Sequence, residues 1–317
     1  MELIPLTGRV SNIESLNSSG RVKTPSESYL NSLHSSKSRE VMRSYLNRVA
    51  QLFGYRSHQD ADWSKLVRDD VSAVMDYLAK EGRSPNTVRV YLAAIKGVVK
   101  EAWSKGLVSA EQLERVRSVK PPKGVRLPKG RRLQDSEVAA LLKACEKGGG
   151  VRGARDAALL SILVGCGLRR SEVVAIKLSD MDLGAGEIRV LGKGDKERLA
   201  HLPGLVVEKI NGWLEYRGEH EGYLFNRVWK NDGVSDYGLT DRAVLFILER
   251  RAQEAKIKPC RPHDLRRTFA TKLFEQKVDA LTIQKMMGHA NLETTQKYDK
   301  RGDDEAKRVA NSFEFGV

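Results

Sequence analysis

The sequence predicts a mostly α-helical protein of two domains, a small helical bundle followed by an α+β domain with a small antiparallel sheet. Its 317 residues exceed the usual size of one domain. Apolar residues recur at three- and four-residue steps through the first third of the chain, which is typical of amphipathic helices. Two β-prone runs flank a glycine-rich turn only in the second half, at residues 187–202.

The first segment, residues 1–26, is rich in Ser, Asn and Gly and lacks apolar periodicity. We expect a flexible tail there, too short to form a folded domain of its own. It has no basic stretch followed by a long apolar core, so the sequence predicts no signal peptide.

Residues 27–117 carry the pattern of a helical bundle. Val41, Tyr45 and Val49 recur on one face of a predicted helix. Ser84-Pro85 is a typical helix start, with Ser as the N-cap and Pro at the first helical position, and Gly106 ends that helix.

Residues 118–134 form the predicted interdomain linker, because their prolines and glycines interrupt any regular element. The segment holds six Lys or Arg and no Asp or Glu, out of a formal net charge of +14. It reads equally as a solvated, disordered linker and as one that orders on a phosphate backbone.

Residues 135–317 form the predicted second domain. Asp135 is expected to cap its first helix, and Gly148-Gly149-Gly150 closes that helix as a loop, since no Gly-Lys-Ser/Thr follows as in a phosphate-binding loop. A buried helix over residues 153–165 precedes the hairpin of residues 187–202, and everything after the hairpin is expected to be helical.

The composition narrows the class of protein. A net charge of +14 favours a polyanionic partner such as a nucleic acid. Cys145, Cys166 and Cys260 lack the spacing of a zinc site or disulfide framework, which fits reduced thiols in the cytoplasm. The longest apolar stretch, residues 157–168, is too short to span a bilayer.

The last third of the chain carries groups suited to phosphodiester chemistry. His263 and Arg266 share one helix face, and His289 is expected at an exposed helix end after the Gly288 stop. Tyr298 is expected on the next short helix. A tyrosine hydroxyl can attack phosphorus while imidazole and guanidinium groups move protons and hold charge, so this chemistry requires no metal.

Two cationic groups complete the constellation. Arg169 follows the end of an apolar helix, where its guanidinium can face a cleft, and Lys193 lies at the hairpin tip. Taken singly, an Arg or Lys is usually a surface charge, a His a helix cap and a Tyr part of a core. It is the joint order of the six groups that is specific.

In these motifs the chain resembles the tyrosine recombinase family, which is phage integrase-like and includes Xer-like enzymes. The departures, Cys166, Met287 and Asp299-Lys300, do not touch a catalytic group. The residues that match the family motifs are Arg169 in Gly-Leu-Arg-x-Ser-Glu, Lys193 in Gly-Lys-Gly-Asp-Lys-Glu-Arg, His263 and Arg266 in His-x-x-Arg, His289 in Gly-His, and Tyr298 after Thr294-Thr295.

The resemblance implies a core-binding domain over residues 27–117 and a catalytic domain with a C-terminal tail over residues 135–317. It implies site-specific recombination through a 3′-phosphotyrosyl intermediate, without metal, ATP or cofactor. His263 would accept the tyrosine proton, Arg169 and Arg266 would hold the phosphate oxygens, His289 would hydrogen-bond the phosphate, and Lys193 would protonate the leaving 5′-oxygen. Glu172 would orient Arg169 or would be a solvated acid.

The implied partners are double-stranded recombination sites, further copies of the chain in a tetramer on two sites, and accessory DNA-bending proteins, in a cytoplasmic, nucleoid-associated setting. Residues 299–317 would form a helix that docks on a neighbouring subunit or packs on its own domain. A solvated face explains the candidate DNA contacts equally well; they are Lys120, Lys123, Arg126, Lys129, Arg131, Arg132, Arg89, Lys96 and Lys100.

Two other functions fit parts of the pattern. A type IB topoisomerase uses a similar set of groups but religates the same strand, so strand transfer between two sites would distinguish it. A non-catalytic architectural DNA-binding protein would share the basic, helical character but would form no covalent adduct.

Overall fold

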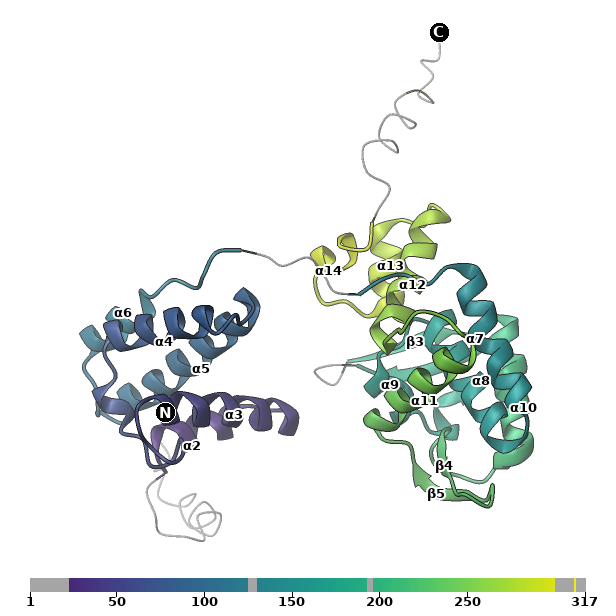
Figure 1. Ribbon diagram of the computed structural model, residues 1–317, viewed down its shortest axis with the longest axis horizontal. Coiled ribbons are helices and arrows are strands. Elements are labelled where there is room, and N and C mark those ends of the chain that lie inside the picture. Colours follow the sequence, from purple (N-terminus) through teal and green to yellow (C-terminus); the bar gives the residue numbers. More distant parts are fainter. Residues whose placement is uncertain (1–22, 125–129, 193–195, 300–310, 312–317) are drawn as a thin grey trace, which may run out of the picture. The chain divides into compact units, whose positions relative to one another are not determined.

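The computed structural model describes residues 23–124, 130–192, 196–299 and 311, and the chain divides into two compact units between Pro128 and Lys129 (Figure 1). The predicted fold class is confirmed: helices dominate both units, and short antiparallel strands occur in the second. Among the described residues, no helix is long and apolar enough to cross a membrane.

The first unit is a helical bundle built around one long central helix. That helix, α5, begins where Ser84 and Pro85 predict, and the Ser84 side chain accepts the Thr87 N–H at 3.1 Å. Helix α2 begins at Pro25, inside the segment assigned to the tail. The helices of the unit are α2 (Pro25–Ser32), α3 (Ser36–Leu52), the short 3₁₀ helix η2 (Trp63–Lys65), α4 (Arg68–Lys80), α5 (Pro85–Ser104) and α6 (Ala110–Arg117).

The predicted periodicity accounts for the core of this bundle. Helix α5 packs against α2, α3, α4 and α6, and its Val88, Leu92, Ile95 and Val99 are buried. These residues recur at three- and four-residue steps, so one stripe of the helix faces its neighbours.

The second unit is organised around a buried helix. Helix α8 packs against α7, α10 and α12 and contributes a continuous run of buried residues from Ala157 to Leu163 (Figure 1). Gln134, rather than the predicted Asp135, is the N-cap of α7. The helices are α7 (Asp135–Gly148), α8 (Gly150–Gly165), α9 (Arg170–Ala175), η3 (Leu178–Asp180), α10 (Gly204–Arg217), α11 (Asp241–Glu254), α12 (Pro262–Glu275), α13 (Ala280–Met287) and α14 (Leu292–Gln296).

The predicted hairpin is confirmed. Strands β2 (Glu187–Leu191) and β3 (Glu197–His201) pair antiparallel, and β1 (Met181–Asp182) adds a third strand to the edge of β2. Lys193 belongs to the tip of this hairpin, at residues 193–195, which lie outside the described residues.

The prediction that the chain is wholly helical after the hairpin is wrong. Strands β4 (Asn226–Val228) and β5 (Val234–Gly238) form a second, two-stranded antiparallel sheet, with an irregular register between Asn226 and Val228. Strand β4 has only three residues, too few for a period-two alternation, and β5 contains Ser, Asp and Gly, of which Asp and Gly are depleted in strands.

One glycine brings distant parts of the second unit together. Gly167 has φ +61°, and a Cβ there would lie 2.3 Å from the Phe269 ring on α12. Only glycine tolerates both the left-handed backbone and this close approach. The start of α9 is thereby held against α12.

Candidate active site

The side chains of Tyr298 and His263 are in contact in the second unit. The Tyr298 hydroxyl lies 3.2 Å from His263 Nε2, within hydrogen-bond reach. His263 is the second residue of α12, whereas Tyr298 lies two residues beyond the end of α14 and not on that helix as predicted. Tyr298 is only 6% exposed and packs in an apolar cluster with Phe269 and Phe274.

The surroundings of His263 favour its neutral form. Partial loss of solvation, together with the positive charges of Arg267 and Arg266, lowers the pKa of the imidazole below its usual value of 6.5. A neutral imidazole has one ring nitrogen free to accept a proton. Neutral His263 therefore lies in position to accept the proton of the Tyr298 hydroxyl.

The expectation that His289 lies at an exposed helix end is wrong, since the residue is only 8% exposed. Gly288 ends α13 in the left-handed conformation as predicted, but this turn folds the chain back. The His289 N–H donates to the Gln284 carbonyl at 3.1 Å, and the imidazole stacks on the Tyr298 ring with centroids 5.9 Å apart.

His289 is a neutral, oriented group. Its Nδ1 lies 2.8 Å from the Thr295 hydroxyl, a contact that fixes the ring. Burial, with the charges of Arg266 and Arg169, lowers the pKa of His289 to about 4.

Arg266 is a buried cation held by carbonyl oxygens. It is 2% exposed, donates from Nη1 to the Gly167 carbonyl, and donates from Nη2 to the Met287 carbonyl at 2.6 Å. Burial, followed by the charge of Arg169, lowers the pKa of Arg266 to about 10. The guanidinium stays charged at neutral pH and links the turn before α9 to the end of α13.

Arg169 lies beside it as the N-cap residue of α9. Its Nη1 donates to Glu172 Oε1 at 2.6 Å and its Nη2 to the Gly288 carbonyl at 3.0 Å. Glu172 is 4% exposed, so it is an oriented partner of Arg169 and not a solvated acid. Burial alone would raise the pKa of Glu172, but hydrogen bonds from Arg198 and Arg169 outweigh it and lower that pKa.

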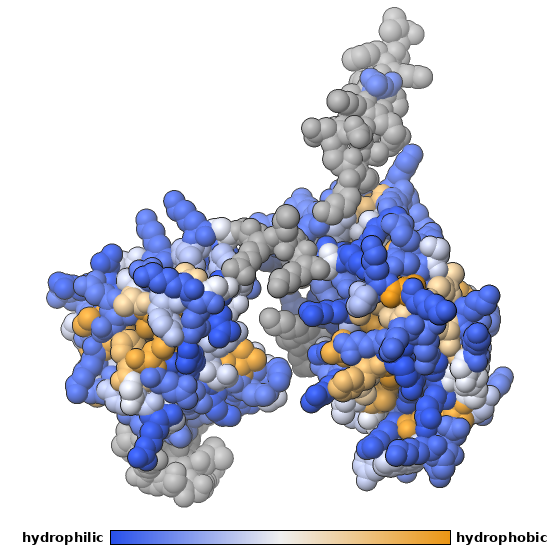
Figure 2. Space-filling model, viewed as in Figure 1, coloured by the Kyte–Doolittle hydropathy of each residue, from blue (hydrophilic) through white to orange (hydrophobic). Residues whose placement is uncertain are grey.

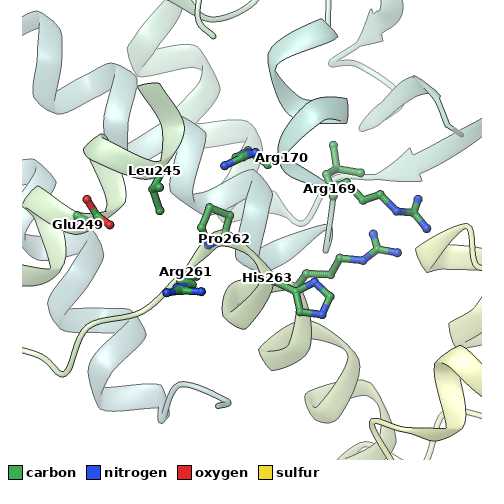
Figure 3. Close-up of a pocket in the computed structure, with 9 residues that line it drawn as sticks. Arg169, Arg170, Leu245, Glu249, Arg261, Pro262 and His263 are labelled. Carbon is green, nitrogen blue, oxygen red and sulfur yellow. The ribbon is translucent and has the colours of Figure 1, made fainter. Parts of the chain in front are cut away.

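A pocket of 380 Å³ opens beside these groups, between α9, α11 and α12. In Figure 3, Arg169 and His263 extend toward the same side of the pocket, while Arg170 points the other way. The lining residues are Leu168, Arg169, Arg170, Leu245, Glu249, Arg261, Pro262, His263 and Arg266. The concentration of guanidinium groups suits an anionic group.

The structure thus brings Arg169, His263, Arg266, His289 and Tyr298 into one site. Lys193, the sixth residue of the predicted set, lies outside the described residues. Among the residues that the structure does describe, no three His, Cys, Asp or Glu side chains are grouped as potential metal ligands.

In the first unit, some of the predicted DNA contacts hold the chain's own backbone. Lys96 donates to the Arg117 and Val119 carbonyls at 2.7 and 2.8 Å, and Arg89 donates to the Pro122 and Gly124 carbonyls, both at 3.2 Å. Those that remain exposed there are Lys100, Lys120 and Lys123.

In the second unit, both described candidates pair with acidic side chains. Arg131 pairs with Glu137 at 2.7 Å, and Arg132 pairs with Glu275. The two remaining candidates, Arg126 and Lys129, lie outside the described residues.

Sequence reasoning missed two residues that support the site, Arg198 and Thr295. Arg198 on β3 donates to both carboxylate oxygens of Glu172, at 3.2 and 2.9 Å. Both residues lie inside motifs already singled out: Arg198 ends the Gly-Lys-Gly-Asp-Lys-Glu-Arg run that contains Lys193, and Thr295 stands three residues before Tyr298. Neither motif shows which side chain these residues contact.

Comparison with known proteins gives matches over both units. Residues 131–305 match the phage integrase family, and residues 27–106 match the phage integrase N-terminal SAM-like domain. Tyrosine recombinase XerD of Listeria monocytogenes is 34% identical over 242 residues, covering 75% of this chain and 79% of the relative. Tyrosine recombinase XerC of Shewanella amazonensis is 32% identical over 259 residues, covering 80% and 81%.

Solved structures share the fold. The XerH site-specific recombinase bound to its difH substrate aligns with a TM-score of 0.62 at 22% identity, covering 99% of this chain and 92% of that one. The Tn1549 transposon integrase in complex with transposon right end DNA aligns with a TM-score of 0.67 at 18% identity, covering 90% and 98%.

Proposed function

The chain belongs to the phage integrase family and is a tyrosine recombinase, and we propose that it cuts and rejoins DNA at specific sites through a covalent link to Tyr298. The observation that carries this proposal is the 3.2 Å contact between the Tyr298 hydroxyl and His263 Nε2, beside the paired guanidiniums of Arg169 and Arg266.

The chemistry follows from the groups in the site. The Tyr298 oxygen attacks the scissile phosphorus, its proton passes to neutral His263, and the bond from phosphorus to the 5′-oxygen breaks. Arg169 and Arg266 hold the non-bridging oxygens, where negative charge collects in the transition state. The product is a 3′-phosphotyrosyl link and a free 5′-hydroxyl.

His289 and Lys193 are the proposed hydrogen-bond and proton donors of the site. We assign the donor role in the contact between Thr295 and Nδ1 to the hydroxyl, so that neutral His289 keeps an N–H on Nε2 to donate to the phosphate. Lys193 supplies the proton that the departing 5′-oxygen takes. Because the phosphotyrosyl link conserves the energy of the phosphodiester, reversal of these steps joins a new strand without ATP.

DNA is the proposed substrate of both units. The relatives are named recombinases, and similarly folded proteins are described in complexes with their DNA sites. We assign residues 27–117 to core binding, 118–134 to the linker and 135–317 to catalysis. The topoisomerase and architectural alternatives are not favoured, because the relatives over most of the chain are recombinases.

Assembly and setting are part of the proposal. Recombination between two sites needs four active tyrosines, so we propose a tetramer on paired sites, with accessory DNA-bending proteins as candidate partners, at the nucleoid. Residues 299–317, which lie outside the described residues except for Asp299 and Asn311, are the proposed contact between neighbouring subunits. Deleting residues 303–317 should leave single-site binding intact and weaken synapsis; unchanged synapsis would exclude this contact.

Covalent trapping tests the function. Randomly nicked genomic DNA from the organism that encodes the protein is incubated with it, so that a nick near the cleavage site lets a short 5′-hydroxyl fragment diffuse away and traps the adduct. The wild-type protein should yield a stable protein–DNA adduct at one recurring sequence, whereas Tyr298→Phe should bind that sequence and yield none. No wild-type adduct, or an equal amount from Tyr298→Phe, would contradict the proposal.

A further inference from the structure

Arg198 lies behind Glu172 in the candidate active site and does not line the pocket. It comes from β3, on the strand face that also buries Ala200, and its side chain is 12% exposed. Its Nη1 and Nη2 donate to the two carboxylate oxygens of Glu172, at 3.2 and 2.9 Å. A guanidinium that holds both oxygens of one carboxylate fixes the orientation of that carboxylate, which a lysine ammonium cannot do.

The same carboxylate holds Arg169. Glu172 Oε2 accepts the Arg169 backbone N–H at 2.8 Å, and Oε1 accepts Arg169 Nη1 at 2.6 Å. Glu172 therefore receives four hydrogen bonds, two from Arg198 and two from Arg169. If Arg198 were removed, the buried carboxylate would have only Arg169 as a partner, and Arg169 would be drawn toward it.

Arg198 also fixes the end of α13. Its Nε donates to the Met286 carbonyl at 3.3 Å. A Cβ on Gly288 would lie 3.0 Å from the Cδ and Nε of Arg198, so the arginine packs against the turn that carries His289. Arg169 donates to the carbonyl of that same glycine.

We propose that Arg198 is a positioning residue for the recombination reaction, which sets the Arg169 guanidinium against the scissile phosphate through Glu172. The inference rests on the proposed function, because it assigns Arg169 to the phosphate. It separates two contributions of the hairpin: the tip supplies Lys193 for the leaving group, and the β3 strand supplies Arg198 for the phosphate oxygens.

The test compares single-turnover adduct formation, at saturating protein, on three suicide substrates of the same sequence. One carries the natural phosphodiester. The second carries a methylphosphonate, in which a methyl group replaces one non-bridging oxygen and removes the negative charge. The third carries a 5′-thiol leaving group, which departs without a proton.

Arg198→Ala should slow adduct formation on the phosphodiester on the order of 100-fold, the scale seen when a transition-state hydrogen-bond donor is lost. The defect should shrink about tenfold or more on the methylphosphonate, because the uncharged linkage depends less on Arg169. It should persist on the 5′-thiol substrate, which should instead rescue Lys193→Ala. Arg198→Lys should also be slow, because it keeps the charge but not the two-pronged contact.

Arg189→Ala is the matched control. It removes one positive charge from the exposed face of the neighbouring strand β2 and should cleave all three substrates like the wild type. If Arg198→Ala does not fold, Arg198→Lys provides the same comparison.

Each outcome decides between the assignments. Equal loss on phosphodiester and methylphosphonate would overturn the positioning role and leave a structural one. Rescue of the Arg198 variants by the 5′-thiol would show that the residue acts through Lys193. A wild-type protein that forms no adduct would overturn the proposed function itself, together with the inference that rests on it.

Discussion

At the scale of single residues, the site depends on keeping imidazoles neutral next to arginines. Loss of solvation is the largest cause that lowers the pKa of both His263 and His289. The charge of Arg267, followed by that of Arg266, adds to it at His263, and the charge of Arg266 adds to it at His289. A neutral His263 can accept the Tyr298 proton as soon as DNA binds. Arg266, which we propose holds the phosphate, thus also helps to keep the proposed base neutral.

This arrangement predicts the pH dependence of cleavage. The lowered pKa of His263 means that its basic form persists below pH 6.5, the usual value for histidine. The second-order rate constant for adduct formation, which reports the free enzyme, should therefore fall on acidification with a midpoint below pH 6.5. A decline centred at or above that pH would contradict neutral His263 as the base.

The identities of these residues could be predicted from the sequence, but their environments could not. Spacing placed His263 and Arg266 on one helix face, and the structure has them there. It could not show that His289 folds back against Tyr298, because that depends on the Gln284 and Thr295 contacts, or that Glu172 is buried between two arginines.

At the scale of elements, the glycine that ends α13 must meet three structural requirements at once. Gly288 adopts φ +61°, its carbonyl accepts from Arg169, and Arg198 packs 3.0 Å from the place where its Cβ would be. A helix stop at this glycine could be predicted from the sequence. The packing of Arg198 could not, because the larger apolar residue beside it, Leu199, points outward and is 52% exposed.

Gly288→Ala should therefore impair cleavage beyond its backbone cost. A non-glycine residue in the left-handed region costs about 1–2 kcal/mol. Gly82, with φ +77° and nothing within 4 Å of its missing Cβ, provides the control. Gly82→Ala should lower the free energy of unfolding by this amount and keep the adduct rate at saturating protein. Gly288→Ala should also lower that rate, by about tenfold or more if Arg198 is displaced; equal adduct rates would refute the packing argument.

Short elements mark the limit of prediction at this scale. The β2–β3 hairpin was evident from two five-residue runs around a glycine turn, whereas β4 and β5 were missed. Their pairing depends on contacts across the sheet that no local pattern encodes.

At the scale of the whole molecule, the positive side chains behind the net charge of +14 are not equally free to bind a phosphate. Figure 2 shows a surface that is mostly hydrophilic, interrupted by small apolar patches. Within the basic segment, Lys120 and Lys123 are exposed, while Arg131 and Arg132 pair with acidic side chains. The sequence showed the charge of this segment but not which charges are already neutralised.

This division predicts different salt dependences of DNA binding. An exposed lysine that contacts a phosphate releases about one counterion, so Lys123→Ala should reduce the slope of log K against log salt by about 1. Arg132→Ala should change the slope less, because that guanidinium already pairs with Glu275. Equal changes from the two variants, measured by titration across salt concentrations, would show that the pairing opens on DNA.

The most direct test of the central claim is the chemical identity of the trapped link. The wild-type adduct is digested with protease and nuclease, and the modified peptide is sequenced by mass spectrometry. The account predicts a nucleotide joined through its 3′-phosphate to the Tyr298 oxygen, with a free 5′-hydroxyl on the released strand. A link on another residue, or through a 5′-phosphate, would contradict it.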